Sequence, residues 1–149
     1  MGLIDDLQPG PVTLDTAVFI YFIEEHPRFL PIVKPVFEAI DRGGLEGVTS
    51  GLTLLEVLVA PYRAGNVALA DHYEAVLTRS RGLRLVDLDR PLLKSAALLR
   101  ATIRVTPPDA IQIATALTAR SRAFPTNDRM IPRVPGLKIL QLRDYVRAR

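Results

Sequence analysis

Residues 11–23 read PVTLDTAVFIYFI and set one carboxylate, Asp15, inside an otherwise apolar run. Val12 and Leu14 predict a short buried strand, and Thr16 is suited to cap a helix that continues to the end of the run. Asp15 is then expected at the exit of the strand, where open α/β sheets gather ligands and catalytic groups. An ionised carboxylate beside so much apolar surface is costly to desolvate, so Asp15 needs a cation or strong hydrogen-bond donors.

The rest of the composition is typical of one folded domain, which we expect to span residues 1–149 with residues 1–10 as a surface extension. The chain is 48% hydrophobic and 23% charged, and it has no cysteine. The lack of cysteine excludes disulfides, thiol catalysis and thiolate metal sites, and leaves oxygen ligands as the main resource for binding a metal. No apolar run approaches the length of a membrane span, and the acidic first residues do not resemble a signal peptide, so we expect a cytoplasmic protein.

The formal net charge is +3, and all but three of the 19 basic residues are arginine, the exceptions being Lys34, Lys94 and Lys138. The planar fork of arginine suits phosphate, which favours a polyanionic partner. Codon bias explains the same composition equally well, so the charge is only a weak indication of function.

Apolar periodicity, helix caps and turn residues predict strands that alternate with helices along the whole chain. Strands are expected at about 11–15, 46–49, 83–88, 122–126 and 137–140, and helices at about 16–25, 29–42, 50–60, 66–80, 89–100, 110–120 and 143–148. This alternation indicates a mainly parallel sheet that is covered by helices on both faces.

Three further acids have settings as unusual as that of Asp15. Glu56 lies within the apolar stretch 54–59 and is expected to point close to a core face, Asp109 follows two prolines at a helix start, and Asp128 follows a strand. Strand exits and helix starts share one edge of a parallel sheet, so Asp109 and Asp128 are expected to converge with Asp15. Glu56 lies further inside its own helix and is expected to lean over the same place. Clustered carboxylates repel one another, and a hard divalent cation such as Mg²⁺ or Mn²⁺ relieves that repulsion. Such an ion supports the hydrolysis of phosphodiesters.

Each acid also has a purely structural interpretation that the sequence leaves open. Asp109 is suited to be a helix N-cap, Asp128 a turn or cap residue, and Asp15 the bend after a strand. Glu56 is equally consistent with the exposed flank of its helix.

Four segments together resemble the PIN domain family, and within it the VapC-like toxins of toxin–antitoxin pairs. They are LDTAVF at 14–19, SGLTLLE at 50–56, TPPDAIQIATA at 106–116 and TND at 126–128. The resemblance implies a three-layer α/β/α fold with a central five-stranded, mainly parallel sheet. It also implies an endoribonuclease that uses Mg²⁺ or Mn²⁺, acts on RNA, forms a homodimer and is held inactive by a cognate antitoxin.

Carried over position by position, the resemblance assigns the metal-binding and catalytic roles to Asp15, Glu56, Asp109 and Asp128. Thr16, Thr126 and Asn127 match positions that support these acids. The sequence departs from the family pattern in its residues 1–10, in Pro125 within a strand, and in the lack of an aromatic residue after Asp128.

Arg129 and Arg133 follow the fourth acid and are candidates for contact with an RNA backbone, although ordinary solvated arginines fit the same positions. Two other functions remain alternatives. One is a catalytically weak PIN-like module that binds RNA or protein. The other is a phosphoaspartyl domain built on Asp15, which is disfavoured because the second acid usual two residues later is replaced by Ala17.

Overall fold

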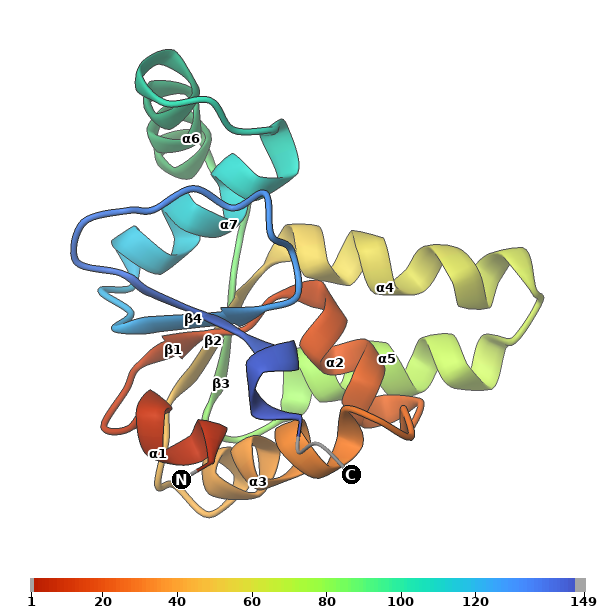
Figure 1. Cartoon of the computed structure of the whole chain (residues 1–149). Coiled ribbons are helices and arrows are strands. Elements are labelled where there is room, and N and C mark those ends of the chain that lie inside the picture. Colours follow the sequence, from red (N-terminus) through yellow and green to blue (C-terminus); the bar gives the residue numbers. More distant parts are fainter. Residues whose placement is uncertain (1, 147–149) are drawn as a thin grey trace.

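Five strands alternate with helices along the chain in the computed structural model, which describes residues 2–146 (Figure 1). The strands are β1 (Val12–Thr13), β2 (Gly47–Ser50), β3 (Leu83–Val86), β4 (Ala123–Thr126) and β5 (Lys138–Gln141). The helices are α1 (Leu3–Leu7), α2 (Thr16–Ile23), α3 (Leu30–Asp41), α4 (Gly51–Arg63), α5 (Val67–Arg79), α6 (Arg90–Thr102), α7 (Pro107–Thr118) and the short 3₁₀ helix η1 (Leu142–Tyr145).

The strands form one sheet in the order β3-β2-β1-β4-β5, and every strand pair is parallel. This confirms the predicted fold class. The chain adds β2 and β3 on one side of the central β1 and then β4 and β5 on the other. The connections leaving β1 and β4 therefore diverge, and a crevice is expected outside the carboxyl ends of these two strands.

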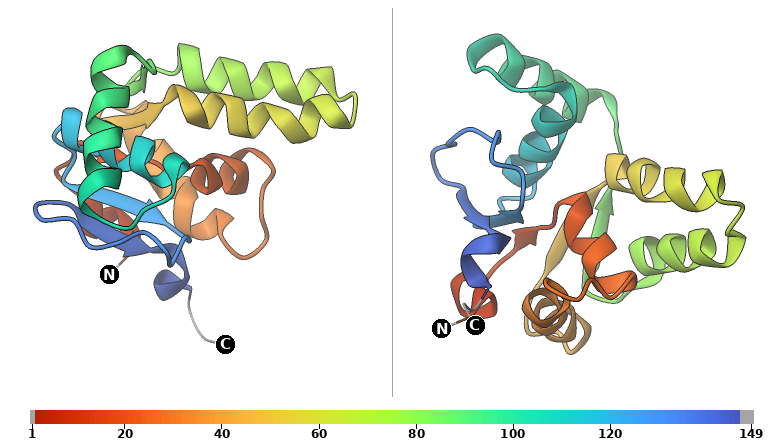
Figure 2. Two further views of the ribbon diagram at one scale, coloured as in Figure 1. Left: turned by 90° about the horizontal axis from the view of Figure 1, so that it is seen from above. Right: turned by 45° about the vertical axis from the view of Figure 1, so that its right-hand side comes forward.

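Helices cover both faces of the sheet (Figures 1 and 2). Val12 and Leu14 are fully buried on one face, in a core shared with α1, α2, α3 and α5. Thr13 points to the other face, where its hydroxyl lies 2.7 Å from that of Ser121, and helix α7 packs there with α6 outside it. The alternation along residues 12–14 thus divides the first strand between the two cores.

Helices α4 and α5 form a hairpin that extends away from the sheet (Figures 1 and 2). Helix α4 ends at Arg63, slightly beyond Pro61, which is one of the two ends that the sequence allows. In α5 the buried residues are Ala70, Tyr73 and Leu77, whereas Val67 is 61% exposed. No helix within residues 2–146 has the length and hydrophobicity that a bilayer crossing requires.

Residues 2–10 are not a surface extension, which corrects the expectation from the sequence. Residues 3–7 form α1, and Leu3 and Leu7 are 3% and 1% exposed in the main core. The end of the chain also differs from the prediction. In place of the helix expected at 143–148, the structure has the 3₁₀ helix η1, and residues 147 and 148 of the expected helix lie outside the described part.

Pro125 explains how the inner strand β4 pairs. β4 is in register with all four residues of β5, but it pairs with β1 only through Ala123 and Val12. A proline has no amide proton for a ladder bond, and here it lies beyond the end of the short β1. At Pro125 the strand is therefore paired on one side only, with β5.

Replacing Leu7 by alanine tests whether α1 is part of the folded unit. The change removes a fully buried side chain from the main core, so we expect the free energy of unfolding to fall by about 2–3 kcal/mol, measured by urea denaturation. Gln8→Ala, an exposed neighbour, is the control and should change it by less than about 0.5 kcal/mol. Equal effects of the two changes would contradict a core role for α1.

Candidate active site at the carboxyl edge of the sheet

The four predicted acids come from four different segments that meet at the divergence of β1 and β4. Asp15 follows β1 and Asp128 follows β4, and these strands are neighbours in the sheet. Asp109 lies in the first turn of α7, and Glu56 lies in α4. Asp15, Asp109 and Asp128 are close enough for their charges to affect one another, and the charge of Glu56 affects Asp15.

Asp15 is the N-cap of α2, a role that the sequence assigned to Thr16. Its Oδ1 accepts a hydrogen bond from the Thr16 amide at 2.8 Å, and its Oδ2 accepts one from the Thr126 hydroxyl at 2.6 Å. Burial raises the pKa of the Asp15 carboxyl, the two hydrogen bonds oppose that rise, and the charges of Glu56 and Asp128 add to it. The bend after β1 is therefore made by Asp15 itself, and the same carboxylate faces the other acids.

Glu56 is exposed, so the expectation that it points close to a core face was wrong. Its Oε1 nevertheless accepts a hydrogen bond of 2.6 Å from the hydroxyl of Thr16. The residue adjacent to Asp15 thus ties Glu56 to the site, and the exposed position leaves its carboxylate open to solvent.

Asp109 is not an N-cap, because Thr106 occupies that position and Asp109 lies three residues further on. Burial and the charge of the neighbouring Asp128 raise the pKa of Asp109 to about 6, although a hydrogen bond from Thr106 lowers it. Asp128 also forms a turn, since its Oδ1 accepts a hydrogen bond from the Met130 amide at 2.8 Å. Its own amide donates to the Thr126 hydroxyl at 2.9 Å, so Thr126 contacts both Asp15 and Asp128.

The loop after β4 is held by Asn127, a predicted supporting residue, together with Tyr21, Gln141 and Arg143, which the sequence did not identify. Asn127 donates from Nδ2 to the Tyr21 hydroxyl at 3.0 Å, and its Oδ1 accepts from the Arg143 amide at 3.2 Å. Arg143 also donates from Nη2 to the Asn127 carbonyl at 3.1 Å, and Gln141 donates to the Asp128 carbonyl at 3.2 Å. These contacts fix the direction in which Asp128 leaves the sheet.

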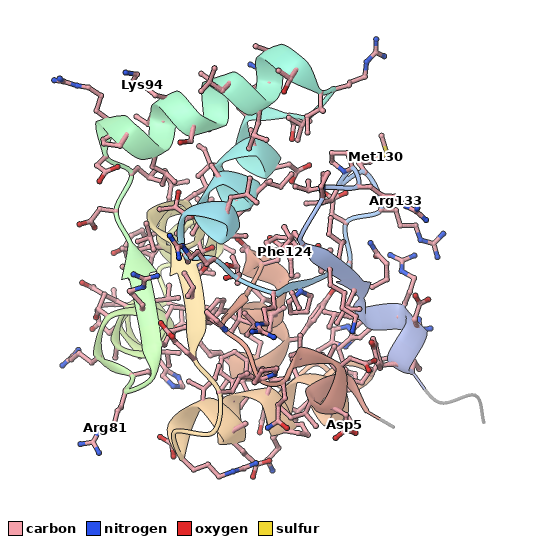
Figure 3. All side chains as sticks on the ribbon, turned by 90° about the vertical axis from the view of Figure 1, so that its left-hand side faces the viewer. Asp5, Arg81, Lys94, Phe124, Met130 and Arg133 are labelled. Atoms are coloured by element: carbon pink, nitrogen blue, oxygen red, sulfur yellow. The ribbon has the colours of Figure 1, made fainter. Side chains whose placement is uncertain are left out.

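Arg129 and Arg133 are both exposed on the loop between β4 and β5. Figure 3 shows Arg133 and the neighbouring Met130 at the outer edge of this loop, pointing away from the body of the protein. The two arginines are thus accessible to a large polyanion approaching the acids from solvent.

The donor chemistry of the four acids fits a hard divalent cation, because it consists of carboxylate oxygens, and burial together with their mutual repulsion raises the pKa values of Asp15 and Asp109. Across residues 2–146, however, no three His, Cys, Asp or Glu side chains are arranged to hold a metal ion as they stand. At least one carboxylate must therefore turn for three of them to share an ion. Glu56, which is exposed and held only through Thr16, has the most freedom to do so.

Replacing Thr126 by valine is expected to raise the pKa of Asp15 further. The valine keeps the shape of the side chain but removes the hydroxyl that donates to Asp15 and accepts from the amide of Asp128. Loss of these buried bonds should also lower the free energy of unfolding by about 1–3 kcal/mol. An NMR titration of the Asp15 carboxyl carbon measures the first effect, and Thr126→Ser, which retains the hydroxyl, is the control; an Asp15 pKa that is the same in the valine variant would contradict the prediction.

Comparison with known proteins gives a family match and several structural matches. The PIN domain family matches residues 12–137. A chain of VapBC2 from Rickettsia felis, bound to a DNA fragment of its promoter, has a TM-score of 0.66 and 16% identity, covering 87% of this chain and 97% of that chain. VapC20 of Mycobacterium tuberculosis, described as a toxin that cleaves the sarcin-ricin loop, has a TM-score of 0.66 and 14% identity, covering 81% of this chain and 92% of its own.

A third structural match is a chain of the DNA-bound VapBC from Salmonella typhimurium, with a TM-score of 0.61 and 23% identity, covering 88% of this chain and 97% of that one. The comparison with curated proteins finds no match. At these identities the structural likeness establishes the fold alone.

Proposed function

We propose, since the chain belongs to the PIN domain family, that it is a Mg²⁺- or Mn²⁺-dependent endoribonuclease that acts as the toxin of a toxin–antitoxin pair. The observation that carries this proposal is the continuous set of hydrogen bonds that links Glu56, Thr16, Asp15, Thr126 and Asp128. It joins acids from three segments at one sheet edge, and Asp109 adjoins it through Asp128. Placing four carboxylates together costs free energy because their charges repel one another, so such a cluster is not expected without a functional role.

In this proposal Asp15, Glu56, Asp109 and Asp128 hold the ion and carry out the catalysis. A bound divalent ion lowers the pKa of a coordinated water and neutralises charge on the phosphodiester that is cleaved. Thr16 and Thr126 orient the carboxylates of Glu56 and Asp15 through the hydrogen bonds that their hydroxyls donate. Asn127 supports the fourth acid by anchoring its loop to Tyr21 and Arg143.

RNA is the proposed substrate, with Arg129 and Arg133 contacting its phosphates. A cognate antitoxin is the proposed protein partner, and the likeness to chains of VapBC complexes supports it. We further propose that residues 1–149 form a single domain, which the packing of α1 into the main core supports, and that the protein is a cytoplasmic homodimer.

Cleavage of RNA by the purified chain tests the activity. Single-stranded and structured RNAs are incubated with Mg²⁺ or Mn²⁺, with and without EDTA, and with Asp15→Asn and Asp71→Asn variants. Asparagine preserves the helix cap at position 15 but removes the charge, and Asp71 is an exposed acid on α5, which makes it a matched control. We expect metal-dependent cleavage that EDTA and Asp15→Asn abolish and that Asp71→Asn leaves unchanged.

The alternatives give different outcomes in the same experiment. If the chain binds RNA but does not cleave it, the protein is a binding module and not a nuclease. Covalent labelling of Asp15 by acetyl phosphate would replace it by a phosphoaspartyl domain.

A further inference from the structure

Helix α7 carries a buried amide, Gln112, that no step of the proposed function uses. Its side chain is 2% exposed and lies one helical turn after Asp109. The other buried residues of this helix are small or aliphatic, apart from Thr115. A buried amide weakens a core unless its polar atoms are satisfied, so its contacts indicate what it does.

Both ends of the Gln112 amide are bonded to the start of helix α4. Its Oε1 accepts a hydrogen bond from the Ser50 hydroxyl at 3.0 Å, and its Nε2 donates one to the Thr53 hydroxyl at 3.0 Å. Ser50 and Thr53 are fully buried, and Thr53 lies three residues before Glu56 on the same helix. One side chain therefore joins the helical turn after Asp109 to the helical turn before Glu56.

Thr49 extends this set of hydrogen bonds toward Asp15. Its hydroxyl faces two acceptors, the Leu14 carbonyl at 3.0 Å and Thr53 Oγ1 at 2.8 Å. A hydroxyl has one proton, so Thr49 shares it between these two oxygens. Thr53 Oγ1 is therefore the acceptor at which the hydrogen bonds from Thr49 and from Gln112 Nε2 meet.

The series of hydrogen bonds that begins at Gln112 thus ends on the backbone carbonyl of Leu14, next to Asp15. Thr53 also lies 3.4 Å from the hydroxyl of Thr16, whose own proton goes to Glu56 at 2.6 Å. Gln112 contacts none of the four acids in this set. Its partner Thr53 contacts Thr16 and Thr49, which bond to Glu56 and to the Leu14 carbonyl, and Gln112 itself lies on the helix of Asp109.

We propose that Gln112 is a positioning residue of the carboxylate site, which holds Asp109, Glu56 and Asp15 in the mutual placement needed to bind a divalent cation. This inference rests on the proposed nuclease function. An aliphatic residue fills the same space, but only a side chain with both a donor and an acceptor fixes the rotation of α7 against α4. Groups that orient metal ligands typically account for about 10- to 100-fold in metal affinity.

The test compares Gln112→Met with Thr115→Val in the full chain. Thr115 is equally buried on α7, but its hydroxyl donates to the Ile111 carbonyl of its own helix at 2.8 Å, so its loss leaves α4 untouched. Mn²⁺ affinity is measured by calorimetry, and kcat and KM are measured with an RNA substrate. We expect Gln112→Met to weaken Mn²⁺ binding and to lower kcat by at least about tenfold each, with KM within about twofold. Thr115→Val should change all three by less than about twofold.

A second pair of variants covers the case in which Gln112→Met fails to fold. Thr53→Val removes the hydroxyl that receives the Gln112 proton, and Thr53→Ser keeps it. The valine variant should reproduce the loss of Mn²⁺ affinity, and the serine variant should restore it to within about threefold of the wild type. Normal Mn²⁺ affinity in both Gln112→Met and Thr53→Val, or an equal loss in Thr115→Val, overturns the inference. A wild-type chain that neither binds Mn²⁺ nor cleaves RNA overturns the proposed function and the inference together.

Discussion

Asp109→Asn is expected to abolish RNA cleavage and, at the same time, to make the folded chain more stable at pH 8. The activity should fall by on the order of 10³-fold in kcat, because asparagine cannot supply the negative oxygen that a divalent cation requires from this position. The gain in stability follows from the neighbours of Asp109, since burial and Asp128 both disfavour its ionised form. An amide of the same size removes the repulsion and still accepts a hydrogen bond from Thr106.

The size of that gain follows from the raised pKa of Asp109, which is about 6 instead of 3.8. A shift of this size corresponds to a few kcal/mol in a fully buried group, and the partial exposure of Asp109 reduces the expected gain to about 1–2 kcal/mol. At pH 4 the gain should be small, because the folded wild-type carboxyl is already largely protonated there.

Urea denaturation at pH 8 and pH 4, together with cleavage rates, measures both effects. Asp71→Asn is the matched control, because this exposed aspartate on α5 lies outside the group of acids; it should leave activity and stability unchanged. An Asp109→Asn variant that is active, or that is less stable than the wild type at pH 8, would contradict the role of Asp109. Higher stability with lost activity is the pattern expected where a site holds like charges together for function.

The strands and most helices were predictable because their signals are local. The fully buried Val12 and Leu14 mark the first strand, and the apolar spacing in residues 30–41 marks α3. Asp15 and Asp128 were expected at strand exits because each follows a short apolar run. The structure adds that β1 and β4 are neighbours at the point where the chain reverses its direction across the sheet.

The missed features depend on contacts between distant residues. Helix α1 has five residues, too few to show a helical period, although Leu3 and Leu7 have the spacing of one buried face. The sequence left open whether Glu56 faces the core or the exposed flank of its helix, and its apolar neighbours could not decide this, because α4 leaves the sheet and buries only part of its surface. Gln112 resembles any polar helix residue in the sequence, and its burial becomes evident only when Ser50 and Thr53 face it.

The second large effect concerns pH, and it has opposite signs for folding and for metal binding. Folding raises the pKa of Asp109 from 3.8 to about 6, and burial raises that of Asp15 as well. The folded chain therefore holds these protons more tightly than the unfolded chain does. For Asp109, this contribution to stability is fully present below about pH 3.8 and is lost as the pH rises through about 6, and the raised pKa of Asp15 acts in the same direction.

A divalent cation binds the ionised carboxylates, so Mn²⁺ affinity should rise with pH across the same range. With a pKa of about 6 for Asp109, we expect the affinity to fall by about 100-fold between pH 7 and pH 4 and to level off above pH 7. Calorimetric titration with Mn²⁺ in buffers of matched ionic strength measures this, with circular dichroism at each pH to show that the chain remains folded. Affinity that is constant from pH 4 to pH 7 would mean that the ion binds away from Asp109. If Mn²⁺ affinity depends steeply on pH in the wild type but only weakly in Asp109→Asn, the proton released on metal binding comes from the Asp109 carboxyl.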